Sequence, residues 1–280
     1  MADPDWWLDP ESAWSAKAAR AGQHIDSLRA EVDDFLRGGS YEVVPEQGGQ
    51  PGETIYRLRM SQPIPIHFST VIGDALHNLR SALDCAACEI ARRHVGRKLV
   101  EEEELACEFP IRSEPSKLEA FFEDRRRANL YGPRERQAIR AVQPAWLHDY
   151  LAERGEANLH ERSQEAAYDH LTVLNRLSNI DKHRRLHVAA WWSELVYWGS
   201  DGPSRRQWQW GTPPFKDGSV LGHLFDSPEH PEPLPELHHE MELRLLDPQG
   251  AATTDIVRLL ESMHHDVTRR VLPHVLNPPS

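Results

Sequence analysis

The longest regular hydrophobic pattern in the chain lies between Thr70 and Arg97 and predicts one central helix. Apolar side chains recur there at steps of three and four residues, which places them on one face of an α-helix: Ile72, Leu76, Leu79, Leu83, Ala86 and Ile90. One residue further on, about 100° round the helix, runs a polar stripe made of Gly73, His77, Arg80 and Asp84. We therefore expect an imidazole, a guanidinium and a carboxylate to be stacked beside the buried face of this helix.

The chain before the central helix predicts a first helix and a β-hairpin. Apolar positions have helical spacing over about 12–36, Ser12 can cap this segment, and two glycines follow it. Residues 41–44 and 54–60 have the composition and alternation of strands, and the sequence between them, PEQGGQPG, is rich in turn-forming residues.

The chain after the central helix predicts more helices and then strands. Short helices are expected over 116–126 and 133–142 and a longer one over 164–180, with an exposed acidic run at 101–104. Strand patterns over 186–198, 207–210, 219–225 and 236–246 predict an antiparallel meander, and a closing helix follows at about 253–273. We predict one α+β domain over 1–280. Its helical bundle, about 12–183, has the N-terminal hairpin and the C-terminal meander (about 186–246) packed alongside.

A second polar segment, NRLSNIDKHRRLH, carries further candidate site residues. Arg176, Asn179 and His183 have the spacing i, i+3 and i+7, so they share a face if the helix extends that far. Lys182 and Arg184 lie near its C-terminal end, where the helix dipole favours cations, and this preference alone can explain them. In a functional interpretation, arginine would hold a phosphate group and histidine would transfer a proton near neutral pH.

The two polar segments resemble known motifs. LHNLRSALD, followed about a hundred residues later by IDKHR, is similar to motifs in a group of uncharacterised bacterial proteins, in which the first commonly ends in histidine as RSALDH. Arginine, four residues and then histidine resembles the signature of the HEPN (higher eukaryotes and prokaryotes nucleotide-binding) superfamily. This resemblance implies a bundle of long helices and, in many members, a metal-independent ribonuclease whose paired arginine and histidine meet across a homodimer. RNA or a nucleotide would then be the partner.

The chain departs from this signature at Cys85, which stands at the position of the histidine. A thiol on a helix with apolar flanks is a poor substitute for imidazole as a general acid. His77, one turn before Arg80, or His183, which forms an Arg-x6-His pattern with Arg176, would have to replace it. The ribonuclease hypothesis assigns the catalytic roles to His77, Arg80, Asp84 and His183, and substrate binding to Arg176, Asn179, Lys182 and Arg184.

The alternative is a non-catalytic α+β binding or structural module. Arg80, Asp84, Asp181 and Arg184 would then form a buried polar network that fixes the two motif helices against each other. The two hypotheses differ in the exposure that they require. Phosphate chemistry needs Arg80 and His183 in an open cleft, whereas a structural network is closed over and its donors are satisfied.

Composition and charge narrow the class of protein. The formal net charge of -12 argues against a protein that coats duplex nucleic acid, because such proteins carry a basic excess. No apolar run approaches the ~20 residues that are needed to cross a bilayer. The N-terminal sequence MADPDWWLDPESAW also lacks the basic lead and the apolar core of a signal peptide. We expect a cytoplasmic protein without a membrane partner.

Metal and cofactor chemistry has little support in the sequence. Cys85, Cys88, His94 and Cys107 formally make a Cys3His zinc set, but the first two lie in the middle of a predicted helix, which favours small buried side chains instead. Three cysteines are also too few for a disulfide framework. The chain contains no GxGxxG, Walker, GxSxG or HExxH sequence. We expect neither a metal ion nor a cofactor.

Overall fold

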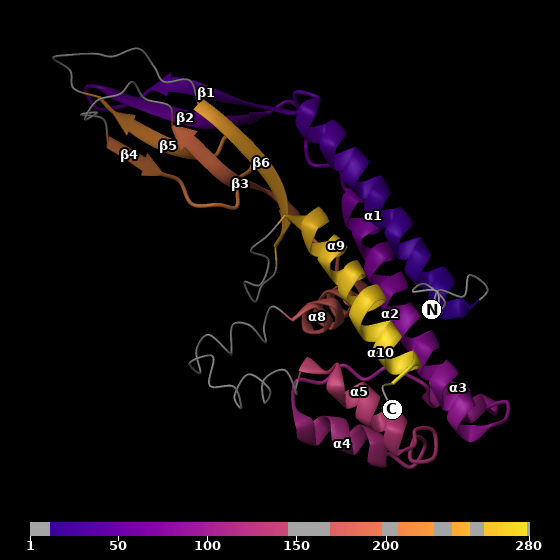
Figure 1. Ribbon diagram of the computed structural model, residues 1–280. Coiled ribbons are helices and arrows are strands. Elements are labelled where there is room, and N and C mark those ends of the chain that lie inside the picture. The colour runs from indigo at the N-terminus through magenta and orange to yellow at the C-terminus, as the bar shows by residue number, and fades with distance from the viewer. Residues whose placement is uncertain (1–11, 145–168, 198–206, 227–236, 247–254, 279–280) are drawn as a thin grey trace, which may run out of the picture. The chain divides into compact units, whose positions relative to one another are not determined.

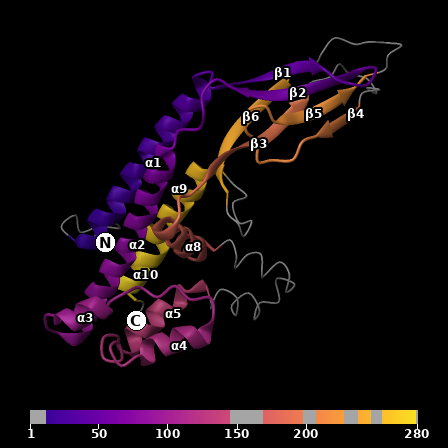
Figure 2. The same cartoon turned by 180° about the vertical axis from the view of Figure 1, so that it is seen from behind.

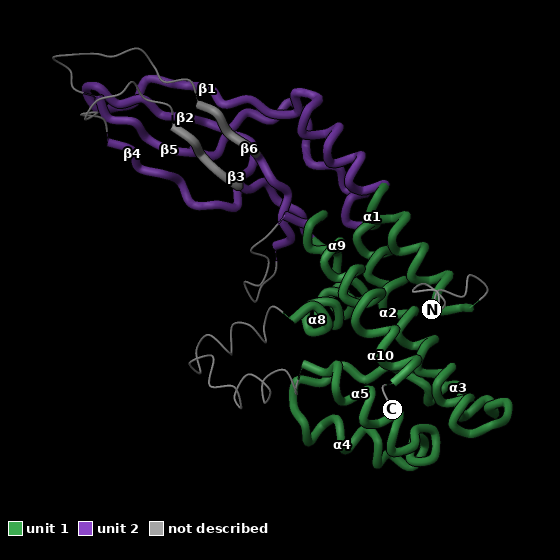
Figure 3. The backbone as a smooth tube through the Cα atoms, viewed as in Figure 1, with its two compact units in different colours: residues 1–26, 70–186, 257–280 green, residues 27–69, 187–256 purple. Residues whose placement is uncertain are grey.

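The computed structural model describes residues 12–144, 169–197, 207–226, 237–246 and 255–278 (Figure 1). The predicted α+β class is confirmed, with an antiparallel N-terminal hairpin and strands in the C-terminal half of the chain. The backbone divides into two compact units (Figure 3). The helical unit comprises Met1–Asp26, Thr70–Leu186 and Val257–Ser280, and the sheet unit comprises Ser27–Ser69 and His187–Ile256.

Two long helices, α1 (Ala13–Arg37) and α2 (His67–Val95), correspond to the first helix and the central helix predicted from the sequence. The six apolar side chains that define the predicted face of α2 are all buried. In the helical unit, α2 runs beside α1 and beside the C-terminal helices α9 and α10 (Figure 2). Contacts along these neighbours include the hydrogen bond from Arg93 Nη1 to the carbonyl oxygen of Leu276, 3.2 Å.

Shorter helices complete the helical unit: α3 (Glu101–Ala106), α4 (Pro115–Glu123), α5 (Pro133–Ala141) and α8 (His170–His183). Proline in the first turn starts α4 and α5, since a helix leaves that N–H group unpaired in any case. The acidic run at 101–104 is the first turn of α3, where the helix dipole favours carboxylates. The sequence predicted its exposure but not this helix. The predicted start of α8 at residue 164 lies outside the described residues.

The closing helix is interrupted by a wider turn. It consists of α9 (Ile256–Asp266), a π-helical turn (Val267–Val271) and α10 (Leu272–Leu276). The sequence predicted one continuous helix here and did not reveal the π turn. Met263, Val267, Val271 and Val275 are all buried, although they follow one another at steps of four. The π turn has more than four residues per turn, so it keeps these side chains on one face where a regular helix would let them drift.

The sheet unit contains two antiparallel sheets. The strands are β1 (Tyr41–Gln47), β2 (Glu53–Met60), β3 (Val188–Tyr197), β4 (Gln207–Trp210), β5 (Val220–Phe225) and β6 (Leu237–Leu245). One sheet has the order β1-β2-β5-β4, and the other pairs β3 with β6. The predicted C-terminal strands are therefore present, but they are divided between two sheets, and β5 pairs with the N-terminal hairpin.

The core of the sheet unit lies between these strands. Its buried members are Tyr56, Leu58, Ala190, Phe215, Leu221, Leu224 and Met241. The N–H of Phe215 donates to the carbonyl oxygen of Ala190, 3.0 Å, which joins β3 to the loop before β5. Alternation of apolar residues identifies the inward face of a strand but not its neighbour, so the sequence could not predict these pairings.

No helix within the described residues is long and apolar enough to cross a membrane.

Candidate functional site

The two motif segments meet at Gly73 in the helical unit. A Cβ atom placed on Gly73 would lie 2.6 Å from each carboxylate oxygen of Asp181, which is nearer than any side chain tolerates. The absence of a side chain at Gly73 therefore allows the C-terminal end of α8 to contact the backbone of α2. The polar stripe of α2 begins at this contact.

The carboxylate of Asp181 has an unusual electrostatic environment. Burial raises its pKa above the ordinary value, the negative charge of Asp74 raises the pKa further, and the charge of His77 lowers it. His77 itself is exposed, and its Nε2 lies 3.4 Å from the hydroxyl of Ser81. The junction of α2 and α8 thus brings two carboxylates and one exposed imidazole together.

Further along α2, Arg80 and Asp84 bind the main chain of Phe109. Arg80 Nη2 donates to the carbonyl oxygen of Phe109, 2.6 Å, and Asp84 Oδ1 accepts from the N–H of the same residue, 2.8 Å. The two side chains also form an ion pair of 3.2 Å across one helical turn. Together they hold both polar groups of Phe109, whose side chain is fully buried.

This arrangement closes Arg80 off from solvent. Its side chain is only 14% exposed, and its Nη1 is buried with no hydrogen-bond partner in the part of the chain that the structure describes. Burial raises the pKa of Asp84, and the charge of Arg80 opposes that effect. Within the same part of the chain, no hydrogen bond or ion pair links Arg80 or Asp84 to Asp181 or Arg184. Of the four residues in the network that the second hypothesis expects, the structure therefore pairs two, Arg80 and Asp84.

The other candidate residues lie on or just after α8. Asp169 caps this helix, because its carboxylate accepts from the N–H groups of Leu171 and Thr172 at 3.0 and 3.1 Å. Arg176 is partly buried, whereas four predicted site residues and their neighbour are exposed: Asn179, Lys182, His183, Arg184 and Arg185. The helix ends at His183, so its last turn presents imidazole and ammonium groups to solvent.

Cys85, at the position of the HEPN histidine, is half-buried on α2. Burial and the charge of Asp84 raise the pKa of its thiol, so the group stays protonated and cannot replace a histidine near neutral pH. The formal zinc set also has no geometric support. Within the described residues, no group of three or more metal-ligating side chains is arranged around a common point, and His94 Nδ1 lies 3.5 Å from Glu135.

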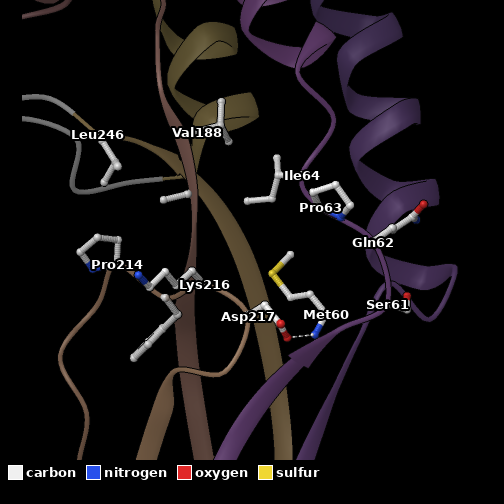
Figure 4. Close-up of a pocket in the computed structure, with 12 residues that line it drawn as sticks. Met60, Ser61, Gln62, Pro63, Ile64, Val188, Pro214, Lys216, Asp217 and Leu246 are labelled. Atoms are coloured by element: carbon white, nitrogen blue, oxygen red, sulfur yellow. Dashed lines mark hydrogen bonds between the residues drawn. The ribbon is translucent and has the colours of Figure 1, made fainter.

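A pocket that the sequence did not predict lies in the sheet unit (Figure 4). It has a volume of about 560 Å³, within the range of small-molecule sites, and its walls are mainly apolar. They include Met60, Ile64, Val188, Phe215 and Leu246. The exposed Lys216 lies at the same pocket, while Asp217 is held by a 2.9 Å hydrogen bond from the N–H of Met60.

A second pocket, of about 670 Å³, lies in the helical unit between the end of α2 and α5. It contains His94, Arg136 and Arg140, but both arginines are already engaged. Arg136 donates to the carbonyl oxygens of Tyr131 and Ala128, 2.8 and 2.6 Å, and Arg140 forms a bidentate pair with Glu119. These contacts favour a structural role for the arginines. Neither pocket includes His77, Arg80, Asp84 or His183.

Comparisons of the chain with protein-family models, curated proteins and solved structures find no match. The resemblance to the HEPN superfamily therefore rests on the motif residues alone.

Proposed function

We propose that the protein is a non-catalytic α+β binding module whose α2 stripe is structural and whose basic α8 end binds phosphate groups of RNA or a nucleotide. The observation that supports this proposal is the burial of Arg80, whose side chain is only 14% exposed and whose Nη2 binds Phe109 and Asp84. A phosphate clamp needs guanidinium N–H groups that reach solvent, whereas Arg80 donates to Phe109 and pairs with Asp84. Its release would leave the carbonyl oxygen of Phe109 without its donor, which costs roughly 1–3 kcal/mol.

The basic end of α8 supplies exposed cationic groups that can bind phosphate, which the buried Arg80 cannot. Lys182, His183, Arg184 and Arg185 are consecutive and exposed, and no ion pair engages them within the described residues. The chain carries a formal net charge of -12, so most of its surface repels a polyanion. Binding would therefore be local and involve few phosphates, so its affinity would fall with rising salt concentration along a shallow slope.

A second candidate function is metal-independent RNA cleavage by His77 and His183, as in the HEPN hypothesis. Its support is the junction at Gly73, because the two exposed histidines come from the segments that meet there. One imidazole would remove the proton of the attacking 2′-hydroxyl, and the other would protonate the departing 5′-oxygen. The resemblance implies that such a protein acts as a homodimer.

One set of assays separates the two candidates. Binding of the purified protein to a fluorescent single-stranded RNA is measured by anisotropy across a salt series. We expect the double variant Lys182→Ala, Arg184→Ala to bind about tenfold more weakly, since it loses two phosphate contacts. Arg125→Ala, Arg126→Ala removes the same charge from another exposed segment and is the matched control.

Cleavage of the same RNA is followed in parallel with the variant His77→Ala, His183→Ala. Cleavage that disappears in this variant establishes the second candidate instead of the first. The binding proposal is refuted if the protein binds no RNA or nucleotide at low salt, or if both arginine-containing double variants weaken binding equally.

A further inference from the structure

The apolar pocket of the sheet unit is built by segments that are far apart in the chain. Its lining comes from the end of β2 and the residues after it, the start of β3, the loop before β5 and the residue after β6 (Figure 4). Main-chain N–H groups tie these segments together: Met60 donates to Asp217 Oδ1 (2.9 Å), Phe215 to the carbonyl oxygen of Ala190 (3.0 Å) and Leu246 to that of His187 (2.7 Å). The pocket is therefore preformed, so a ligand would not have to order its walls.

Several polar side chains at this pocket are engaged by the protein itself. Ser61 Oγ donates to a main-chain carbonyl oxygen, 3.1 Å, and Gln62 Nε2 donates to a serine hydroxyl, 2.6 Å. One carboxylate oxygen of Asp217 accepts from the N–H of Met60. Leu246, by contrast, leaves 42% of its apolar surface exposed at the pocket. A ligand that fills this space must therefore be largely apolar, since a polar body would be desolvated without gaining partners.

Lys216 adds a cation to this apolar site. It is exposed at the pocket, and within the part of the chain that the structure describes no hydrogen bond or ion pair engages its ammonium group. An ammonium group beside an apolar cavity is complementary to a ligand with an apolar body and an anionic head. The carboxylate of Asp217 lines the same pocket and would repel a dianion such as a phosphate monoester. A head group with a single negative charge therefore fits best.

We propose that this pocket binds a fatty-acid-like carboxylate, whose alkyl chain lies between the apolar walls and whose head group pairs with Lys216. The chain would contact Met60, Ile64 and Val188 and cover the exposed part of Leu246. A volume of about 560 Å³ accommodates such a ligand. An alkylammonium ion fits less well, because Lys216 would repel it and one oxygen of Asp217 is already hydrogen bonded.

The test is equilibrium dialysis of the full-length protein with radiolabelled decanoate at neutral pH. We expect saturable binding. Among unlabelled competitors, affinity should rise about tenfold at each step from octanoate to decanoate to dodecanoate, since every added methylene group is buried. Decanol and decylammonium carry the same chain with a neutral and a positive head group. Both should compete about tenfold more weakly than decanoate, because neither can pair with Lys216.

Substitutions of Lys216 test the contact with the head group. Lys216→Met keeps an apolar stem and removes the charge, so it should weaken decanoate binding about tenfold and leave decanol binding unchanged. Lys216→Arg keeps the charge and should bind decanoate within about twofold of wild type. Lys98→Met is the matched control, because Lys98 is exposed in the helical unit and does not line the pocket.

The proposal is overturned if decanoate does not bind, if decylammonium competes as strongly as decanoate, or if Lys216→Met and Lys98→Met bind decanoate equally. Lys216 is exposed, so its substitution leaves the core intact, and unchanged decanol binding in Lys216→Met shows that the pocket is still formed. RNA is absent from these measurements, and the basic end of α8 is unchanged in every variant. The outcome is therefore independent of the proposed function.

Discussion

The carboxylate of Asp181 lies against the backbone of α2 at Gly73, where a Cβ atom would be 2.6 Å from both of its oxygens. A helix interior normally disfavours glycine by about 1 kcal/mol relative to alanine. The contact with Asp181 explains why glycine occupies this helical position, since any larger residue would force α8 or the carboxylate to move. Gly73, the first residue of the polar stripe on α2, is therefore required for steric reasons.

A double-mutant cycle tests this relationship. We expect Gly73→Ala to be neutral or destabilising in the wild type, because its methyl group displaces the carboxylate. In an Asp181→Ala background the same change should stabilise the protein by up to about 1 kcal/mol, because only the gain in helix propensity remains. Urea unfolding measures all four free energies. Gly22→Ala on α1, whose Cβ would lie 3.3 Å from His264, is the control and should have the same effect in both backgrounds.

Arg80 stabilises the folded protein through its hydrogen bond to the carbonyl oxygen of Phe109 and its ion pair with Asp84. We expect Arg80→Ala to lower the free energy of unfolding by about 1–3 kcal/mol, because the carbonyl oxygen of Phe109 and the carboxylate of Asp84 both lose a partner. Arg92→Ala on the same helix removes a pair with Glu104 in which both side chains are more than 40% exposed, so it should cost less than about 1 kcal/mol. Equal losses in the two variants, measured by urea unfolding, would contradict a structural role for Arg80.

The N-cap of α8 should make stability depend on pH in a direction opposite to that of a salt-bridged carboxylate. Burial raises the pKa of Asp169 above its ordinary value of 3.8. The unfolded chain therefore ionises first, and the contribution of Asp169 to stability falls as pH rises from 3.8 through the higher pKa of the folded state. Asp169→Asn keeps a capping oxygen and cannot ionise.

We therefore expect the stability of Asp169→Asn relative to wild type to increase as the pH is raised from about 3 to about 7. Asp169→Ala should lose about 1 kcal/mol at every pH relative to Asp169→Asn, since it has no capping oxygen. Urea unfolding of the three proteins across this series supplies the comparison. A relative stability of the Asn variant that decreases with pH would show that the pKa of Asp169 is lowered instead.

The pocket of the sheet unit should bind apolar anions. Anilinonaphthalene sulfonate combines an aromatic body, which suits the apolar walls, with an anionic group that Lys216 can pair. We expect Leu246→Asp to weaken dye binding about tenfold, because it places a charge on the apolar wall. Ile66→Asp is the matched control, since Ile66 is exposed and does not line the pocket. Fluorescence titration that shows equal binding to both variants would place the dye elsewhere.

Helix positions were the most predictable part of this fold. The apolar face of α2 is apparent from the spacing of Ile72, Leu76 and Leu79, since helical periodicity is a local property of the chain. The pairing of β5 with β2 could not be predicted from the sequence, because Tyr56 and Leu224 reveal only that their strands have a buried face. Neighbouring strands are chosen by tertiary packing, for which the sequence carries no local signal.

The candidate site was predictable in its residues but not in their partners. Spacing on α2 placed Arg80 and Asp84 one turn apart, as the structure shows. Their common partner is the main chain of Phe109, and every non-proline residue offers the same N–H and carbonyl groups, so nothing distinguishes it in the sequence.

Because of the π turn at Val267–Val271, the closing helix should tolerate the deletion of one residue there better than an insertion. A wider turn of this kind holds one residue more than regular helical geometry requires. Removing Thr268 would let the backbone return to an ordinary α-helix, while Val271 and Val275 would keep nearly the same orientation towards the core. Adding a residue at that point would instead rotate everything downstream by about 100°. Relatives of this protein should therefore vary here by single-residue deletion and not by insertion.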